Sequence, residues 1–202
     1  MSATGSNSVI IGFGHYSRTG KTTIAEMLQK ELTRRNIHTI IWPLAEELKA
    51  IAFRLYQWAG LHCGVYYEIT DRAKERYEKL RGLPYTPVEL WVKLGNAIRS
   101  VDEASWVNYI FQEFNDSHDV LIIPDVRFPS EVKAIRERGG LLFKVTRPGV
   151  EPLDTESDKA LLDYDGWDGE IRNNGPLSAL DVPVKVLVKT VIEGLDAKRN
   201  GG

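Results

Sequence analysis

The segment from Gly12 to Thr23 (GFGHYSRTGKTT) holds the residues whose types and spacing point most directly to chemistry. Its Gly20-Lys21-Thr22 is the end of the phosphate-loop pattern G-x-x-x-x-G-K-[ST], and it lies between an apolar run and a segment with helical spacing, as that pattern requires. The backbone N–H groups of such a loop surround a β-phosphate, the lysine bridges the β- and γ-phosphates, and the hydroxyl ligates Mg²⁺. We therefore expect ATP and Mg²⁺ to bind here, through Gly14, His15, Ser17, Thr19, Gly20, Lys21, Thr22 and Thr23.

One position of this segment departs from the pattern. His15 stands where the first glycine is usual, and Gly14 lies one residue earlier. The first turn of the loop is therefore expected to differ from the usual one, whereas Gly20-Lys21-Thr22 is intact. The alternative interpretation is a glycine turn that happens to precede a helix containing a lysine.

Charged residues also follow two later apolar runs. The run that ends at Pro124 is followed by Asp125 and Arg127, and the next run is followed by Arg147. At the carboxyl edge of a sheet, the carboxylate of Asp125 can hold Mg²⁺ or position an acceptor, although it could instead cap the next helix or pair with Arg127. Together with Arg18, the two later arginines would neutralise phosphate oxygens during transfer, although each could also be a surface group. No guanine-selecting Asn-Lys-x-Asp occurs, which weighs against a GTPase.

The elements that must position these residues alternate between strands and helices. Short apolar runs predict strands at 8–13, 39–42, 120–124 and 141–146. Apolar residues at helical spacing predict a first helix that carries Ile24, Leu28 and Leu32. The same kind of spacing predicts further helices at 45–58, 86–99, 102–114, 129–138 and 184–198. Strands that are apolar throughout are typical of a parallel sheet covered on both faces. The predicted fold is therefore the three-layer α/β/α fold of P-loop NTPases, with a mostly parallel sheet.

Length and composition predict one domain. The chain has 202 residues, a formal charge of −2 and one cysteine, so no basic field would attract nucleic acid and no internal disulfide can form. We expect a core at 8–43 and 116–202, a helical insertion at 44–115 and an irregular acidic segment at about 148–168. Because no export signal or membrane span is recognisable, we expect a cytoplasmic protein, without membrane or stable nucleic-acid partners, that is a monomer or a homodimer.

Several segments resemble the deoxynucleoside monophosphate kinases of bacteriophages. They are Val120–Glu131 (VLIIPDVRFPSE), with a "P-D-x-R" strand end, Val145–Gly149 (VTRPG), Leu94–Asn96 followed by Trp106-Val107, and Ile171–Leu177 (IRNNGPL). With the phosphate loop, these segments cover most of the chain from residue 8 to about 180, in the family's order. The resemblance implies transfer of a phosphoryl group from ATP to a nucleoside monophosphate for DNA precursor synthesis, in the host cytoplasm if the protein is phage-encoded.

The resemblance also implies roles for individual residues. Lys21 and Thr22 would hold ATP and Mg²⁺, and Arg18 would face the transferring phosphoryl group. Asp125 and Arg127 would lie beside the donor and acceptor phosphates. Arg147 would stand at the start of a lid at about 148–168, and Asn173 would lie beside adenine. The chain departs from the family at Thr22, where aspartate is frequent, and in the lid, where a family "H-x-S-E" is represented by Asp154–Asp158 (DTESD).

In this interpretation the helical insertion at 44–115 binds the acceptor. Its arginines would grip a monophosphate and its aromatic residues would stack on a base, which makes Arg72, Arg76, Trp91 and Arg99 the candidate substrate-binding residues. Arg99 is the preferred phosphate ligand, since it lies on a well-capped helix beside the Leu-Gly-Asn segment. The alternative is that residues 71–81, with charges of both signs, form a solvated helix face.

Two other functions are compatible with the sequence. A P-loop kinase could act on a hydroxyl of a modified pyrimidine or of a small metabolite, with Asp125 as general base. A non-catalytic module could instead bind ATP only to change its shape, without forming a phosphorylated product.

Overall fold

The computed structural model describes residues 8–69, 71–114 and 117–200, and within them the chain divides into two compact units. The second unit is Leu44–Tyr109, and the first unit consists of the parts of the chain that precede and follow it. Each unit has its own apolar cluster, centred on the sheet in the first unit and on Tyr67 in the second. Each unit is therefore described by itself.

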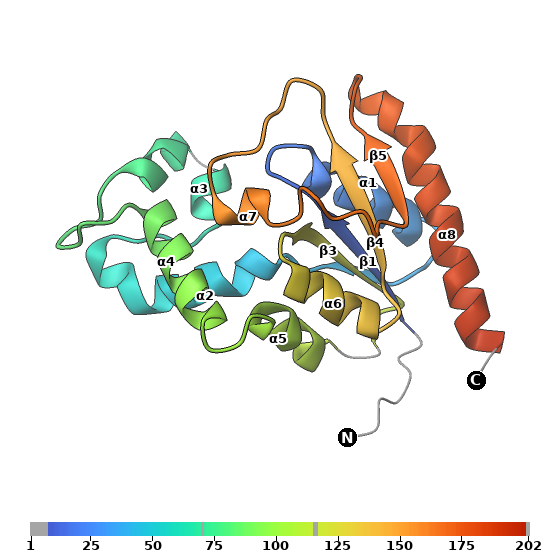
Figure 1. Ribbon diagram of the computed structural model, residues 1–202, viewed down its shortest axis with the longest axis horizontal. Coiled ribbons are helices and arrows are strands. Elements are labelled where there is room, and N and C mark those ends of the chain that lie inside the picture. Colours follow the sequence, from blue (N-terminus) through green and yellow to red (C-terminus); the bar gives the residue numbers. More distant parts are fainter. Residues whose placement is uncertain (1–7, 70, 115–116, 201–202) are drawn as a thin grey trace. The chain divides into compact units, whose positions relative to one another are not determined.

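The first unit is built on a five-stranded parallel sheet in the order β2-β3-β1-β4-β5 (Figure 1). The strands are β1 (Val9–Gly14), β2 (Thr39–Ile41), β3 (Val120–Val126), β4 (Leu141–Thr146) and β5 (Gly169–Arg172). β1 lies in the middle, with Val9 opposite Val120 of β3 and Ile11 opposite Leu141 of β4. Because β1 is the middle strand of the five, the loop that follows it leaves the centre of the carboxyl edge.

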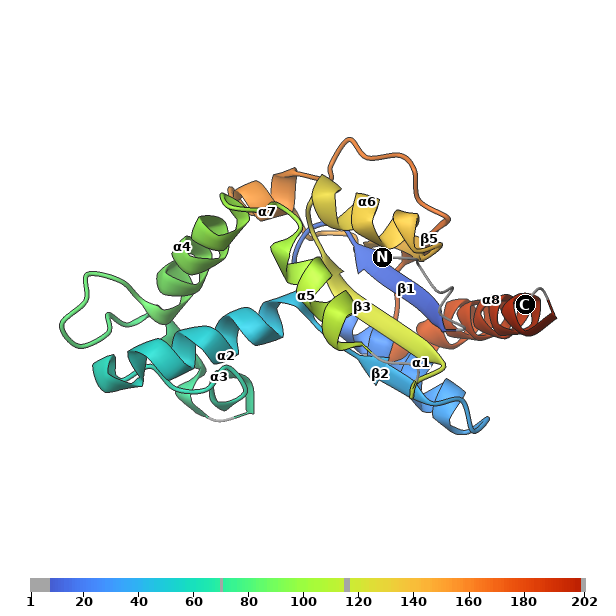
Figure 2. The ribbon, with the colours of Figure 1, turned by 90° about the horizontal axis from the view of Figure 1, so that it is seen from below.

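Helices cover both faces of this sheet. On one face, Ile11 and Phe13 share an apolar cluster with α1 (Lys21–Thr33) and α8 (Asp181–Asn200). On the other face, a Cβ placed on Gly12 would meet Ile135 of α6 (Pro129–Glu137) at 3.3 Å. Figure 2 shows α6 and α1 on opposite sides of the strands. This arrangement confirms the three-layer α/β/α fold that the sequence predicts.

Three features of the first unit differ from the sequence prediction. β5 was missed because Ile171 is its only buried residue, so that no apolar run marks it. The segment expected to be irregular contains α7 (Glu156–Lys159), and η3 (Leu177–Leu180) precedes α8. α8 itself begins before the predicted residue 184, because Pro183 falls in its first turn, where a missing N–H breaks no helical hydrogen bond.

The second unit contains α2 (Leu44–Tyr56), η1 (Gln57–Ala59), α3 (Tyr66–Ile69), η2 (Asp71–Tyr77) and α4 (Pro87–Arg99), and α5 (Ser105–Glu113) begins in it. Tyr67 is 2% exposed, and its hydroxyl accepts a hydrogen bond of 2.9 Å from the N–H of His62. The predicted start of α4 is confirmed: Thr86 is the N-cap, and Glu89 completes a capping box. Among the described residues, no helix combines the length and apolar character needed to cross a bilayer.

Candidate functional site

The phosphate loop joins the buried end of β1 to the first turn of α1. Gly20 is the N-cap of α1 in the left-handed conformation, with φ 97°, and no side chain caps the helix there. A Cβ on Gly20 would lie 2.5 Å from the Asn173 side chain, so both the backbone and the surrounding space require glycine. The first-turn N–H groups of α1 are thus left for an anion, next to the positive end of the helix dipole.

His15 occupies the place of the first glycine and adopts the conformation that glycine favours. Its φ is 91°, and that of Arg18 is 63°. The imidazole is buried and lies against the ring of Tyr16, with 4.3 Å between ring centroids and 47° between the ring planes. Within the described part of the chain its Nδ1 finds no hydrogen-bond partner. Burial, reinforced by the charges of Lys144 and Lys21, lowers the pKa of His15 to about 4, so the ring is neutral at neutral pH.

Lys21 carries the central charge of the loop. Its side chain is buried, and its Nζ donates to the carbonyl of Tyr16 and, at 3.3 Å, to Thr19 Oγ1. Burial, followed by repulsion from Arg127, lowers the pKa of Lys21 to about 7, against the attraction of Asp158 and Asp125. A cation that is poorly solvated in the absence of an anion gains much when a phosphate approaches.

A cavity of about 290 Å³ opens at this edge of the sheet and gathers the predicted catalytic residues. It is lined by Arg18, Gly20, Lys21, Thr22, Pro124, Asp125, Arg127 and Arg147. The lining therefore carries four basic side chains and one carboxylate, which favours a polyanionic ligand. All five residues predicted to be catalytic and both predicted metal ligands lie in this lining.

The oxygen atoms of the lining also suit Mg²⁺. Thr22 is exposed and Asp125 is partly exposed, and hydroxyl and carboxylate oxygens are the ligands that this ion prefers. In the described residues, no three His, Cys, Asp or Glu side chains cluster as a metal site would require. An ion here would therefore take its remaining ligands from phosphate and water, as Mg²⁺ commonly does.

Asp158 of α7, which the sequence analysis named only as the end of the lid motif and not as a site residue, contacts the phosphate loop and Arg127. Its Oδ1 accepts from Ser17 N at 3.1 Å, from Ser17 Oγ at 2.7 Å and from Arg127 Nη1 at 3.0 Å, and its Oδ2 accepts from Leu153 N at 3.0 Å. These hydrogen bonds lower the pKa of Asp158, against the effect of burial. The available signal was Thr155, a helix N-cap that fixes Asp158 in the first turn of α7.

Asn173, Trp167 and Glu151 support the loop from its other sides. The side-chain amide of Asn173 donates to the carbonyl of Thr19 at 3.0 Å, so this predicted adenine neighbour also holds the loop. The ring of Trp167 lies so close to Gly14 that a Cβ there would approach it to 2.4 Å. The guanidinium of Arg18 donates to the carbonyl of Glu151 at 3.2 Å. Of the remaining predicted loop residues, Thr19 is buried and Thr23 is half-buried.

In the second unit, the predicted acceptor-binding residues are engaged with neighbours of their own. The guanidinium of Arg76 lies 4.9 Å from the ring of Tyr77 and donates to its hydroxyl at 2.9 Å. Trp91 packs edge-on against Tyr67, with 5.6 Å between ring centroids, and is a partly buried residue packed against the core of this unit. Arg99 donates to Asn96 Oδ1 at 3.4 Å. The side chain of Arg72 lies outside the described residues.

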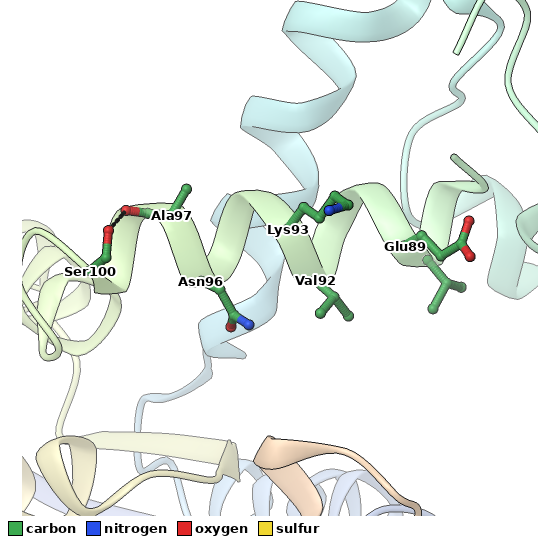
Figure 3. A pocket seen from close by; sticks show the side chains of 7 residues that line it. Glu89, Val92, Lys93, Asn96, Ala97 and Ser100 are labelled. Carbon is green, nitrogen blue, oxygen red and sulfur yellow. Dashed lines mark hydrogen bonds between the residues drawn. The ribbon is translucent and has the colours of Figure 1, made fainter. Parts of the chain in front are cut away.

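One face of α4 borders a second, wider cavity of about 750 Å³ (Figure 3). It is lined by Val88, Glu89, Val92, Lys93, Asn96, Ala97 and Ser100. Figure 3 shows Val92 and Asn96 pointing the same way from the helix, and Val92 is 54% exposed. Sequence reasoning selected Arg99 on this helix, whereas Arg99 is not among the residues that border the cavity. Among the residues that border it, Asn96 belongs to the Leu94–Asn96 segment named for the resemblance.

Comparison with known proteins finds a family model that matches part of the chain. Residues 92–184 match the family model described as deoxynucleotide monophosphate kinase. The deoxynucleotide monophosphate kinase of Enterobacteria phage T4 is 31% identical over 98 residues, which make up 46% of this chain and 41% of that protein. The "Putative deoxynucleotide monophosphate kinase" of Acanthamoeba polyphaga mimivirus is 40% identical over 58 residues, 28% of this chain and 30% of that protein. The matched part thus spans less than half the length of either relative, and it confirms the resemblance found in the sequence.

Solved structures show a more distant likeness. The APS kinase CysC of Mycobacterium tuberculosis, in complex with AMPPNP and APS, aligns over 92% of this chain and 98% of its own, with 9% identity and a TM-score of 0.45. A likeness of this size is too weak to say anything about substrates.

Proposed function

We propose that this protein transfers the γ-phosphoryl group of ATP to a deoxynucleoside monophosphate and so makes a diphosphate for DNA synthesis. The observation that carries the proposal is the cavity at the phosphate loop, where Lys21, three arginines, Thr22 and Asp125 converge. The match of residues 92–184 to the deoxynucleotide monophosphate kinase model supports the choice of acceptor.

The reaction forms a bond between an acceptor phosphate oxygen and the γ-phosphorus and breaks the bond from that phosphorus to the oxygen bridging it to the β-phosphate. Charge spreads over the phosphoryl oxygens on the way, so positioning and neutralisation do most of the catalysis. In this proposal Lys21 bridges the β- and γ-phosphates, and Arg18, Arg127 and Arg147 neutralise the migrating group. An acceptor phosphate is already largely ionised near neutral pH, so no strong general base is needed.

ATP and Mg²⁺ fit the residues that are present. The uncapped N-terminus of α1 and the left-handed Gly20 leave inward-facing amides for a phosphate, and Thr22 and Asp125 would hold the ion. When bound, Mg²⁺ would neutralise phosphate charge. Asn173, which already contacts the loop at Thr19, would lie at the adenine end. In this proposal the segment 148–168 is the lid that excludes water.

The acceptor is assigned to the second unit, on the exposed face of α4. The apolar surface of Val92 offers a place for a base, and the side-chain amide of Asn96 can pair with base edges. Lys93, which also borders this cavity, and Arg99 would supply charge for the monophosphate. Arg72, Arg76 and Trp91 stay predictions, as do the cytoplasmic location and the oligomeric state.

The test is to incubate the protein with ATP, Mg²⁺ and each ribo- and deoxynucleoside monophosphate in turn and to separate the products. We expect ADP and a nucleoside diphosphate in equal amounts. A Lys21→Ala variant should lose turnover by about 10²-fold or more, because it removes a charge aimed at the migrating group. Lys189→Ala, at a solvent-exposed lysine of α8, is the matched control.

The outcomes separate the alternatives. A phosphorylated hydroxyl compound in place of a diphosphate would select the other kinase function, and ATP binding without any product would select the non-catalytic module. Equal turnover in the Lys21→Ala and Lys189→Ala variants would contradict the assignment of the phosphate loop.

A further inference from the structure

The carboxylate of Asp158 connects three segments of the first unit that are far apart in sequence. It accepts from the backbone N–H and the hydroxyl of Ser17 in the phosphate loop, from Arg127 after β3, and from the N–H of Leu153 in its own segment. Its side chain is 1% exposed, whereas that of Arg127 is 19% exposed. A buried carboxylate with four donors is held in one place, and it holds its donors in turn.

Asp158 contacts Arg127 but does not line the cavity. Arg127 lines the cavity together with Lys21 and Asp125, but neither Asp158 nor Ser17 is among the lining residues. One terminal nitrogen of the Arg127 guanidinium donates to Asp158 and to the carbonyl of His15, at 3.0 and 2.8 Å, and the other lies 3.3 Å from Ser17 Oγ.

We propose that Asp158 is a positioning residue that fixes Arg127 and the Ser17 side of the phosphate loop for phosphoryl transfer. This inference rests on the proposed function and adds to it a residue that acts without touching the substrate. An arginine has several rotatable bonds and loses entropy when it is ordered; the ion pair orders it before the phosphates arrive. Since the carboxylate belongs to the segment 148–168, its contact with Arg127 exists only while that segment is docked on the loop.

The first variant is Asp158→Asn, which keeps the size of the side chain and removes its charge. The introduced amide would have one oxygen for the four donors and would present an NH₂ group to one of them. We expect kcat to fall about tenfold to hundredfold, because displacement of a positioning group by an ångström costs that much. The KM for ATP should change less than about threefold, since Lys21 and the α1 amides remain in place.

The matched control is Asp154→Asn, in the same segment. The side chain of Asp154 is 94% exposed and pairs with Lys159 at the surface. Its removal should leave kcat and KM unchanged, because an exposed pair orders nothing at the site.

A double-mutant cycle separates positioning from a merely structural role. Arg127→Lys keeps the charge but loses the fork that Asp158 and Ser17 hold. If Asp158 acts through Arg127, the kcat of the double variant should lie less than about threefold below that of the Arg127→Lys single variant. Multiplied losses in the double variant, or an Asp158→Asn enzyme as fast as the Asp154→Asn control, would overturn the inference.

A second variant tests the same inference if the Asp158→Asn protein does not fold. Its thermal unfolding curve shows whether it folds. Ser17→Ala removes the hydroxyl that contacts both Asp158 and Arg127, while the backbone amide stays. It should lower kcat about threefold to tenfold and should be non-additive with Arg127→Lys in the same way. An inactive wild-type protein would refute the proposed function; an active wild type with additive losses would refute only the role of Asp158.

Discussion

Replacement of Lys21 by methionine should stabilise the folded protein, although it removes the central charge of the phosphate loop. The fall in the pKa of Lys21 from 10.5 to about 7 means that the fold disfavours the charged form. At about 1.36 kcal/mol for each pKa unit, the charged Lys21 lowers the free energy of unfolding of the wild type by about 5 kcal/mol below pH 7, relative to a lysine whose pKa did not change on folding. Methionine leaves the carbonyl of Tyr16 without its donor, at a cost of about 1–3 kcal/mol, so we expect a net gain of about 2–4 kcal/mol at pH 6.

The pH dependence gives a sharper test than the absolute gain. Below pH 7 the lysine is charged in both the folded and the unfolded state, and the full penalty applies. Between pH 7 and 10.5 the unfolded state binds more protons than the folded state, so the stability of the wild type rises with pH. From pH 6 to pH 9 the penalty should shrink from about 5 to about 2 kcal/mol. The advantage of Lys21→Met should therefore shrink by about 3 kcal/mol over this range.

The assay is urea unfolding of both proteins at pH 6, 7.5 and 9, in buffers free of phosphate and nucleotide so that no anion pairs with Lys21. Hydrogen exchange of the amides of β1 would follow the unit that contains the loop. A difference in unfolding free energy that stays the same at all three pH values would refute the reasoning, because it would mean that Lys21 stays charged in the fold.

Three further predictions concern the loop and α4. The affinity of the wild type for a non-hydrolysable ATP analogue should fall about tenfold from pH 8 to pH 9, because Lys21 of the nucleotide-free protein loses its proton. The affinity of the Lys21→Arg variant should stay constant over this range, since arginine keeps its charge. Calorimetric titration measures both affinities, and a wild-type affinity that does not change with pH would argue against the low pKa of Lys21. Gly20→Ala should lower the free energy of unfolding by about 2–4 kcal/mol, and Gly139→Ala should lower it by roughly 1–2 kcal/mol. Both glycines have positive φ, but of the two only Gly20 would bring its added methyl group against Asn173. Equal losses of unfolding free energy in the two variants would contradict this close approach. Thr86→Ala should lower the free energy of unfolding, measured in urea, by about 1 kcal/mol, because it removes the N-cap of α4. Thr86→Ser keeps a capping hydroxyl and should lower it by less. A larger loss in Thr86→Ser than in Thr86→Ala would contradict the role of Thr86 as a cap.

The fold was predictable where strands contain a run of apolar residues. The runs at β1, β3 and β4 carry the signal of a parallel sheet, and Gly20-Lys21-Thr22 marks the point where the first strand passes into its helix. β5 carried no such signal, because an edge strand with one buried residue looks like a loop.

The site was predictable where charge stands at the end of a strand. Asp125, Arg127 and Arg147 lie at the ends of β3 and β4, and parallel strands bring their carboxyl ends to one edge, so these residues reach the cavity with Lys21. Asp158 was not predictable in this way. It lies 12 residues beyond the end of β4, in the acidic segment 148–168, and only the docking of that segment on Ser17 shows what its carboxylate contacts.

The strand order bears on how this chain folds as it emerges from the ribosome. β1 and β2 are not neighbours: β2 pairs only with β3, and β1 pairs with β3 and β4. About 80 residues separate the end of β2 from the start of β3, and at about 5–20 residues per second their synthesis takes roughly 4–16 s. For that time the two apolar strands have no partner in their own sheet, so nascent chains should be most prone to aggregate, and most in need of a chaperone, before residue 120 has been translated.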